Sequence, residues 1–203
     1  MVDQLPEELR ALKTQLKAFI NEVVIPSEPE LMSEDANSER VAAELKTKAK
    51  EAGLWALGHP SEIGGGGLPF MDFVYLNEVI GRSHWGQWAV GSLSMQDSIM
   101  LHLYASDEQR ERFLEPLVAG EIYPSVGLTE PEVAGSDPTQ MQATAVLDGD
   151  EWVISGHKWF TSGANRAAFT TVFAITEPDA EKHNKFSSII VPTDTEGYEI
   201  VRV

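Results

Sequence analysis

The spacing of the apolar residues changes near residue 120, and this change restricts the fold more than any other feature of the 203-residue chain. Before that point, apolar residues recur at steps of three and four, which is typical of amphipathic helices. After it, apolar and polar residues alternate, which is typical of half-buried strands. Helices followed by strands, instead of alternating with them, indicate segregated layers. We therefore expect an α+β fold in which a helical part precedes a β part.

Five helices are expected in the first part. The first apolar stripe ends at Pro26, because proline lacks the N–H that the next helical hydrogen bond needs. The second helix is expected to open at Ser38 and to end with Gly53 as its cap. Ser106 and Gln109 form the capping-box pattern at the start of the fifth. The expected ranges are 5–23, 38–53, 69–81, 87–105, which should be well buried, and 106–121.

The second part contains a strong hairpin signal. It is Asp148-Gly149, since glycine tolerates the positive φ that tight turns require. Alternating residues flank this turn, and further alternating segments follow it. The last expected strand runs to the final residue, Val203. The expected strands span 139–147, 151–155, 168–176, 186–192 and 198–203.

Charge and composition exclude several classes of function. A formal net charge of -17 repels phosphate backbones and anionic lipid, so we expect neither a nucleic-acid partner nor a membrane partner. Cysteine is absent, which excludes disulfides and thiolate nucleophiles. No apolar run approaches the length of a membrane span, and the N-terminus shows no signal or transit pattern. A cytoplasmic protein is the default expectation, with mitochondrion or peroxisome open for a eukaryotic source.

Three further patterns give little support for a site. The run Gly64–Gly67 invites a phosphate-loop interpretation, but it lacks the Gly-Lys-Ser/Thr ending, so a flexible inter-helix loop is favoured. The five histidines show no metal-ligand spacing, so no metal site is expected. No serine lies in a G-x-S-x-G elbow, which disfavours a serine hydrolase.

Two segments of the β part combine residues that suit a ligand. "SVGLTEPEVAGSDP", 125–138, interrupts a strand with a constrained loop whose glycines and hydroxyls permit close polar contacts. "GHKWFTSGA", 156–164, places Trp159 two residues before Thr161, and such residues face the same way on a strand. A flat ring beside a hydroxyl suits a planar ligand. A core tryptophan next to a turn is an equally weighted alternative.

At these two segments the chain resembles the acyl-CoA dehydrogenase family. That family shows a Leu/Val-Thr-Glu-Pro…Gly-Ser-Asp loop and, downstream, a Lys-x-Trp-Ile-Thr-Asn-Gly-like segment. The corresponding residues are LTEP at 128–131, GSD at 135–137 and KWFTSG at 158–163. The resemblance covers essentially the whole chain. The first loop is one residue longer than the commonest form, as in a subgroup that acts on long or unusual acyl chains. Phe160 and Ser162 stand where isoleucine and asparagine are frequent.

The resemblance implies two domains and a cofactor. Residues 1–121 would form an up-down helical domain, and residues 122–203 an incomplete β-barrel or β-sandwich. FAD would lie against the second domain, and the chemistry of the redox step would belong to the flavin. The implied reaction abstracts an α-proton and transfers a β-hydride to flavin N5, so that an acyl-CoA becomes a trans-2-enoyl-CoA, as in fatty-acid β-oxidation.

The resemblance also implies roles for individual residues. Thr129 and the loop backbone would address the flavin ring edge, Trp159 would pack beside the ring, and Thr161 would hydrogen-bond near N5. Ser136 would lie near the pyrophosphate and would also bind the phosphate arm of the substrate. The implied cofactor-binding residues are Val126, Gly127, Leu128, Thr129, Glu130, Gly135, Ser136, Trp159, Phe160 and Thr161.

The catalytic base is expected outside this chain. Members of the family carry it as a glutamate in a C-terminal helical domain, so Glu130 and Glu132 are assigned to turn chemistry and the chain alone is expected to be inactive. The implied partners are acyl-CoA, an electron-transfer flavoprotein or similar acceptor, and further copies in a dimer or tetramer. The alternatives are a non-catalytic flavin- or acyl-CoA-binding scaffold or partner subunit, and a same-fold flavin oxidase or monooxygenase.

Overall fold

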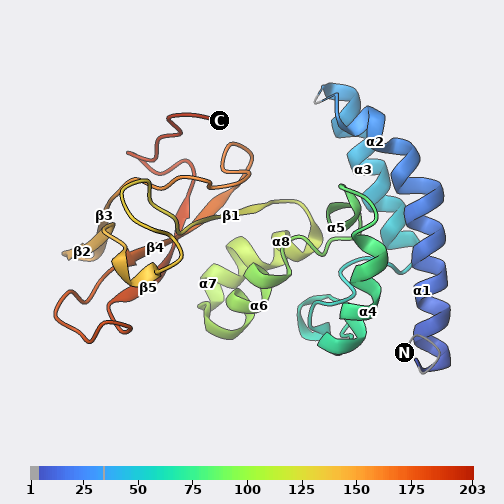
Figure 1. Ribbon diagram of the computed structural model, residues 1–203, viewed down its shortest axis with the longest axis horizontal. Coiled ribbons are helices and arrows are strands. Elements are labelled where there is room, and N and C mark those ends of the chain that lie inside the picture. The colour runs from blue at the N-terminus through green and yellow to red at the C-terminus, as the bar shows by residue number, and fades with distance from the viewer. Residues whose placement is uncertain (1–4, 34) are drawn as a thin grey trace. The chain divides into compact units, whose positions relative to one another are not determined.

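The structure is a computed structural model that describes residues 5–33 and 35–203. It divides into two compact units, Met1–Glu121 and Ile122–Val203. The first consists of helices and the second is built on a mixed sheet, so the expected α+β fold is confirmed (Figure 1). No helix within the described ranges has the length and apolar character needed to cross a membrane.

The first helical stretch continues past Pro26, contrary to the prediction. Pro26 lies in the first turn of α2, where the missing N–H of a proline is tolerated. The turn that precedes it is π-helical, and this wider turn accommodates the proline ring. The junction residues keep helical φ and ψ, so the segments form one continuous rod. They are α1 (Glu7–Phe19), the π turn η2 (Ile20–Val24) and α2 (Ile25–Leu31).

Helix α3 (Ala36–Glu51) begins at a different cap from the one predicted. The N-cap is Asp35, whose carboxylate accepts hydrogen bonds from the backbone N–H groups of Asn37 and Ser38, both at 2.9 Å. The bond from Ser38, above all, lowers the pKa of Asp35. Gly53 follows the helix with a φ of 67°, which confirms the glycine cap.

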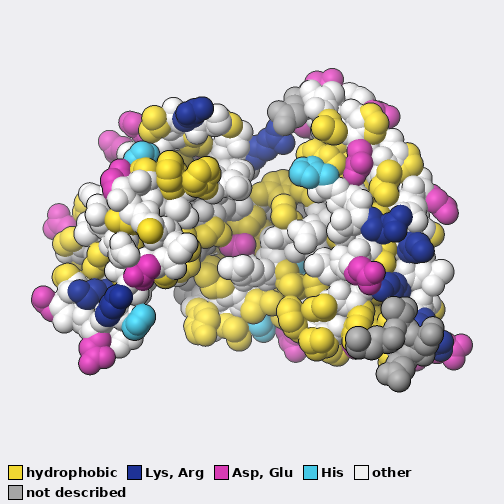
Figure 2. All heavy atoms as spheres, viewed as in Figure 1, with side chains coloured by type: hydrophobic (Ala, Val, Ile, Leu, Met, Phe, Trp, Pro, Cys, Tyr) yellow, Lys and Arg dark blue, Asp and Glu magenta, His cyan; other side chains and the backbone are white. Residues whose placement is uncertain are grey.

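The prediction of a single, well-buried helix over 87–105 is wrong, because the helix is neither continuous nor well buried. It is broken into α5 (Gly86–Ala89) and α6 (Met95–Tyr104), because Gly91 adopts a φ of 68° and turns the chain out of the helix. Tyr104 is 83% exposed, and Leu103 is exposed beside it. Figure 2 shows apolar side chains gathered on the surface of the helical unit.

The remaining helices follow the predicted ranges closely. The Ser106 hydroxyl accepts from the Gln109 N–H at 3.2 Å, and the Gln109 side chain accepts from the Ser106 N–H at 3.0 Å. The predicted capping box is therefore confirmed. The bounds are α4 (Phe70–Ile80), α7 (Asp107–Gln109), the π turn η4 (Arg110–Leu114), α8 (Glu115–Ala119) and the 3₁₀ turn η3 (Ser61–Ile63).

The glycine run at 64–67 is an inter-helix loop, but it is tightly packed. The N–H groups of Gly65 and Gly67 donate to the carbonyls of Pro60 and His59 at 3.0 and 2.9 Å. A Cβ on Gly65 would lie 2.3 Å from the His59 carbonyl oxygen. These N–H groups are used within the loop, so they do not form a cradle for a phosphate.

Trp55 connects the end of α8 to the rest of the helical unit. Its indole N–H donates to the carbonyl of Val118 at 2.8 Å. The Nζ atom of Lys50 lies over the ring, 4.9 Å from its centroid. A Cβ on Gly91 or Gly120 would lie 2.6 or 2.5 Å from a ring atom. The ring therefore occupies space that only glycine leaves free at these two positions.

Buried His59 should make the helical unit sensitive to acid. Its side chain is fully buried, and neither ring nitrogen makes a hydrogen bond to a described residue. Burial lowers the pKa of the imidazole to about 4, although the nearby Ala56 carbonyl acts in the opposite direction. Because the unfolded chain then binds a proton more readily, the stability is complete above pH ~6.5 and is lost as the pH falls toward 4. His59 alone should contribute a loss of about 2 kcal/mol between pH 8 and pH 5.

Urea unfolding at several pH values tests this expectation. The variant His59→Gln should lose about 2 kcal/mol less than the parent between pH 8 and pH 5, because the side chain that titrates is gone. The matched control is His84→Gln, at an exposed histidine of the same unit. The expectation is wrong if the parent and the His59 variant show the same dependence on pH.

Strand β4 is the centre of the sheet in the second unit. Strand β5 pairs along its whole length in the antiparallel sense, whereas β1 and β2 pair with it in parallel. Strand β3 pairs with β2 as an antiparallel hairpin. Five of the seven residues of β4 are buried. The bounds are β1 (Pro124–Gly127), β2 (Thr144–Asp148), β3 (Glu151–Ser155), β4 (Phe169–Ile175) and β5 (Phe186–Pro192).

The predicted strands are confirmed in part. The hairpin is present, and Gly149 in its turn has a φ of 64°. The strand predicted over 139–147 begins only at Thr144, because Pro138–Gln140 forms a 3₁₀ turn, η5. The segment 198–203 is not a strand, since no described strand pairs with it. Alternating side chains alone do not produce a strand without a partner for the backbone.

Candidate functional site

The loop over 128–143 leaves the sheet and returns to the same strand. One edge of β4 is occupied by β5. On the other edge, Gly127 pairs with Val172 at the end of β1, and Thr144 pairs with Ile175 at the start of β2. The polar loop is therefore an excursion whose two ends are both fixed on β4. This arrangement explains why strand-like residues flank a segment that is not a strand.

The buried side chain of Glu130 stabilises this loop through hydrogen bonds. Its side chain is only 2% exposed. One carboxylate oxygen accepts from the N–H of Gln142 at 2.6 Å, and the other accepts from the N–H of Ala143 and from Lys158 Nζ, both at 2.8 Å. Burial raises the pKa of Glu130, but the hydrogen bonds from Lys158 and the two N–H groups outweigh it and leave the pKa below its usual range. Glu130 is thus a structural anion, and it does not have the properties of a general base.

Lys158 and Trp159 bring the two ligand-suited segments together. Lys158 Nζ donates to the carbonyl of Leu128 at 3.1 Å as well as to Glu130. The N–H of Trp159 donates to the carbonyl of Thr129 at 3.0 Å. Segments that are about thirty residues apart in the sequence are therefore joined directly by side-chain and backbone hydrogen bonds.

Residues 159–161 form an aromatic arm that ends in a buried hydroxyl. Trp159 is 43% exposed and Phe160 is 78% exposed, and their ring centroids lie 4.6 Å apart. Phe160 has a φ of 52°, which is unfavourable for a bulky side chain and is found most often at functional sites. The Thr161 Oγ1 atom is buried and has no hydrogen-bond partner among the described residues. Either a water molecule or a polar ligand beside it would satisfy such an atom.

The second half of the loop makes hydrogen bonds within the loop and is more exposed than the first half. A Cβ on Gly135 would lie 2.9 Å from Thr129 Cγ2, so glycine is needed for this contact. Asp137 accepts hydrogen bonds from the Thr139 hydroxyl and N–H and from Gln140, and these lower its pKa to about 2. The loop residues enclose a small hollow. It is lined by Leu128, Thr129, Glu130, Val133, Ala134, Gly135, Asp137, Pro138 and Met141.

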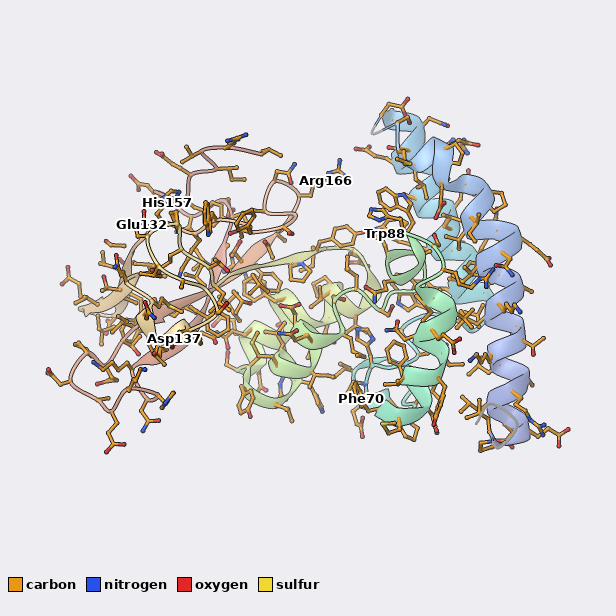
Figure 3. All side chains as sticks on the ribbon, in the orientation of Figure 1. Phe70, Trp88, Glu132, Asp137, His157 and Arg166 are labelled. Atoms are coloured by element: carbon orange, nitrogen blue, oxygen red, sulfur yellow. The ribbon has the colours of Figure 1, made fainter. Side chains whose placement is uncertain are left out.

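An exposed contact between a carboxylate and an imidazole joins the same two segments at the surface. Glu132 and His157 lie beside each other, with 3.5 Å between Oε1 and Nδ1, while Asp137 lies apart from them (Figure 3). Both side chains of this pair are about half exposed. Glu132 is therefore a surface residue of the loop, and its contact reaches the other segment.

The predicted site residues occupy three kinds of environment. Gly127 and Glu130 are buried; Leu128, Thr129 and Thr161 are half-buried; Val126, Gly135, Ser136, Trp159 and Phe160 are exposed. Lys158 was not among the predicted site residues, although it occupies a position within the family motif. A lone lysine beside a tryptophan gives no sign of its partner, and the partner carboxylate lies in the other segment. Only the fold reveals the pair.

The exposed residues fit a planar, polar-edged cofactor such as a flavin. Trp159 and Phe160 offer ring faces, and Thr161 offers a buried hydroxyl with no protein partner. Metal binding has no comparable support, since no group of three or more acidic or histidine side chains within 5–33 and 35–203 is arranged to hold an ion.

The sequence matches two family profiles that together cover nearly the whole chain. Residues 6–121 match the acyl-CoA dehydrogenase N-terminal domain, and residues 125–203 match the acyl-CoA dehydrogenase middle domain. The profile that covers residues 6–121 alone extends over more than half of the chain.

Individual relatives agree with the profiles. Probable acyl-CoA dehydrogenase FadE2 of Mycobacterium tuberculosis is 35% identical over 94% of this chain and 49% of its own length. A putative acyl-CoA dehydrogenase from Mycobacterium abscessus superposes with a TM-score of 0.83 at 33% identity, over 95% of this chain and 52% of that one. A Mycobacterium smegmatis glutaryl-CoA dehydrogenase in complex with FADH2 superposes with a TM-score of 0.72 at 26% identity, over 95% and 47%.

The matches cover nearly all of this chain but only part of its relatives. The chain spans between about a fifth and a half of the length of the first curated relatives that it matches. Within this chain, the two family profiles together cover both the helical and the sheet unit, and each of the three relatives matches 94% or 95% of the chain. The chain therefore belongs to the acyl-CoA dehydrogenase family.

Proposed function

We propose that this chain supplies the flavin-ring site of an FAD-dependent acyl-CoA dehydrogenase. The observation that carries the proposal is the hydrogen bond from Trp159 N–H to the Thr129 carbonyl, which places the polar loop beside the aromatic arm. The buried Thr161 hydroxyl without a partner and the relative that holds FADH2 give independent support.

Different residues of the chain would hold different parts of the cofactor. Thr129 and the loop backbone would address the edge of the ring, and Trp159 would pack beside it. The Thr161 hydroxyl would donate to N5, and Ser136, which is exposed, would face the pyrophosphate and the phosphate arm of acyl-CoA. When bound, the flavin supplies the oxidation of the acyl-CoA α,β-carbon bond. Donors fixed at the ring edge favour the negative charge that develops there.

The base that removes the α-proton is proposed to lie outside this chain. Both oxygens of Glu130 are occupied by hydrogen bonds, and Glu132 is an exposed residue that faces His157. Neither carboxylate is available for a substrate proton. The chain alone should therefore bind flavin without turning over a substrate.

The partners follow from the same proposal. The substrate would be an acyl-CoA, the electron acceptor an electron-transfer flavoprotein or similar protein, and the complete enzyme a dimer or tetramer. A non-catalytic flavin-binding scaffold or partner subunit is the main alternative, and it also predicts flavin binding. The two differ in whether the completed protein oxidises acyl-CoA.

The test combines a binding and an activity measurement. FAD is titrated into the chain, and acyl-CoA-dependent dye reduction is followed for the chain alone and for the chain joined to the remaining half of the FadE2 relative. We expect saturable FAD binding, no turnover by the chain alone, and turnover by the joined protein. Binding without turnover in the joined protein favours the scaffold. Absence of FAD binding in both forms contradicts the proposal.

A further inference from the structure

We propose that Glu130 and Lys158 are positioning residues that fix the aromatic arm, Trp159–Thr161, in its orientation toward the flavin. This inference rests on the proposed function, because it concerns the same site. The new element is that the affinity for flavin depends on a buried ion pair whose two side chains hydrogen-bond to protein groups and not to the cofactor.

The pair is placed where three segments meet. Glu130 lies in the loop after β1, and it accepts hydrogen bonds from Gln142 and Ala143, just before β2. Lys158 follows β3, and it donates to Glu130 and to the Leu128 carbonyl. Ala143 is itself fixed, because its carbonyl accepts from the N–H of Ile175 at 2.8 Å, at the end of β4. The ion pair thus ties the arm to the central strand of the sheet.

The arm has few other attachments. Residues 156–161 belong to no strand, so no sheet ladder holds them. Among the described residues, the Trp159 N–H donates to the Thr129 carbonyl, and the Ser125 hydroxyl donates to the Ser162 carbonyl at 3.0 Å. The carbonyls of Phe160 and Thr161 accept only from N–H groups two or three residues further along the chain. Phe160 is in the left-handed region, a conformation that persists only when its surroundings impose it. Lys158 lies directly before the aromatic arm, and its largely buried side chain donates to the loop at Leu128 and Glu130.

Burial separates this pair from the contact between Glu132 and His157. The side chains of Lys158 and Glu130 are 12% and 2% exposed. Removing one buried partner leaves an unpaired charge and is strongly destabilising, whereas replacing both can leave the fold intact. Glu132 and His157 join the same segments but are half exposed, so water screens them. They provide a matched control at the same place in the chain.

The experiment uses the 203-residue chain and two readouts. One is the hydrogen exchange of the Trp159 N–H, which reports on the bond to Thr129 without any ligand. The other is the dissociation constant for FAD, together with the absorption spectrum of the bound flavin. The variants are Lys158→Met, the double variant Glu130→Gln with Lys158→Met, and the control Glu132→Gln.

The double variant decides the question, because it removes both charges and should fold even if Lys158→Met alone does not. We expect its Trp159 N–H to exchange about 10-fold faster or more. Its FAD dissociation constant should rise about 10- to 100-fold, which is the size of effect found for residues that orient the groups of a binding site. The bound flavin spectrum should shift, and Glu132→Gln should match the parent.

A folded double variant with the exchange rate and FAD affinity of the parent overturns the inference, and the pair is then only structural. If the parent binds no FAD even when joined to the FadE2 half, the proposed function fails instead. In that case the exchange rate of Trp159 still decides whether the pair fixes the arm.

Discussion

The double variant Trp159→Ala with Thr161→Val is expected to bind FAD about 100-fold more weakly than the parent. Loss of an aromatic face that stacks on a ring costs about 1–3 kcal/mol, loss of one hydrogen bond costs about 1 kcal/mol, and each 1.4 kcal/mol is tenfold in affinity. Trp159 is 43% exposed and Thr161 ends in a buried hydroxyl without a protein partner, so neither change removes a described hydrogen bond of its side chain. Quenching of flavin fluorescence measures the affinity.

The matched control for the hydroxyl is Thr171→Val. The Thr171 Oγ1 atom is also buried without a hydrogen-bond partner, but it belongs to β4 and is not part of the arm. This control should keep the FAD affinity of the parent. If Thr171→Val and Thr161→Val weaken binding equally, the effect is a general one on the sheet unit and the arm has no special part in binding.

Gly120→Ala is expected to destabilise the helical unit by about 3 kcal/mol. Gly120 has a φ of 73°, which costs about 1–2 kcal/mol for a residue with a Cβ, and overpacking adds about 1–3 kcal/mol. The added Cβ would lie 2.5 Å from Trp55, whose indole N–H is bonded to Val118. The ring cannot move away without breaking that bond. Urea unfolding followed by tryptophan fluorescence measures the change.

Gly53→Ala separates the two causes. Gly53 has a φ of 67° in the same unit, but a Cβ there would meet no atom within 4 Å. This variant should lose only the conformational part, about 1 kcal/mol. Equal losses at Gly53 and Gly120 would show that the contact with Trp55 contributes nothing.

Patterns that depend on neighbouring residues predicted the fold well. The change of spacing near residue 120, the capping box of Ser106 and Gln109, and the Asp148-Gly149 hairpin are all present in the structure. Each of these features is decided by contacts within a few residues. They were accessible from the sequence for that reason.

Other patterns gave wrong predictions, because the outcome depends on the backbone conformation of the flanking turn or on a distant partner. Pro26 does not end its helix, because a π turn before it accommodates the ring. Residues 198–203 alternate as a strand would, but no described strand pairs with them. The helix predicted over 87–105 is broken at Gly91, where the backbone turns with a positive φ beside Trp55.

The candidate site was likewise predictable only in part. The family motifs identified the loop and the aromatic arm, but they could not show that Glu130 is directed into the loop. A buried carboxylate with three donors is a product of tertiary structure, and its partner Lys158 lies 28 residues further along the chain. The sequence predicts that the polar loop interrupts a strand, and the fold shows that both ends of the loop lie on one edge of β4.

The most direct test of the flavin site is the ¹⁵N resonance of N5 in labelled FAD bound to the chain joined to the FadE2 half. A hydrogen bond from the Thr161 hydroxyl should hold this resonance at a position that Thr161→Val shifts and Thr171→Val does not. An N5 resonance that is the same in the parent and in Thr161→Val would contradict the proposed site.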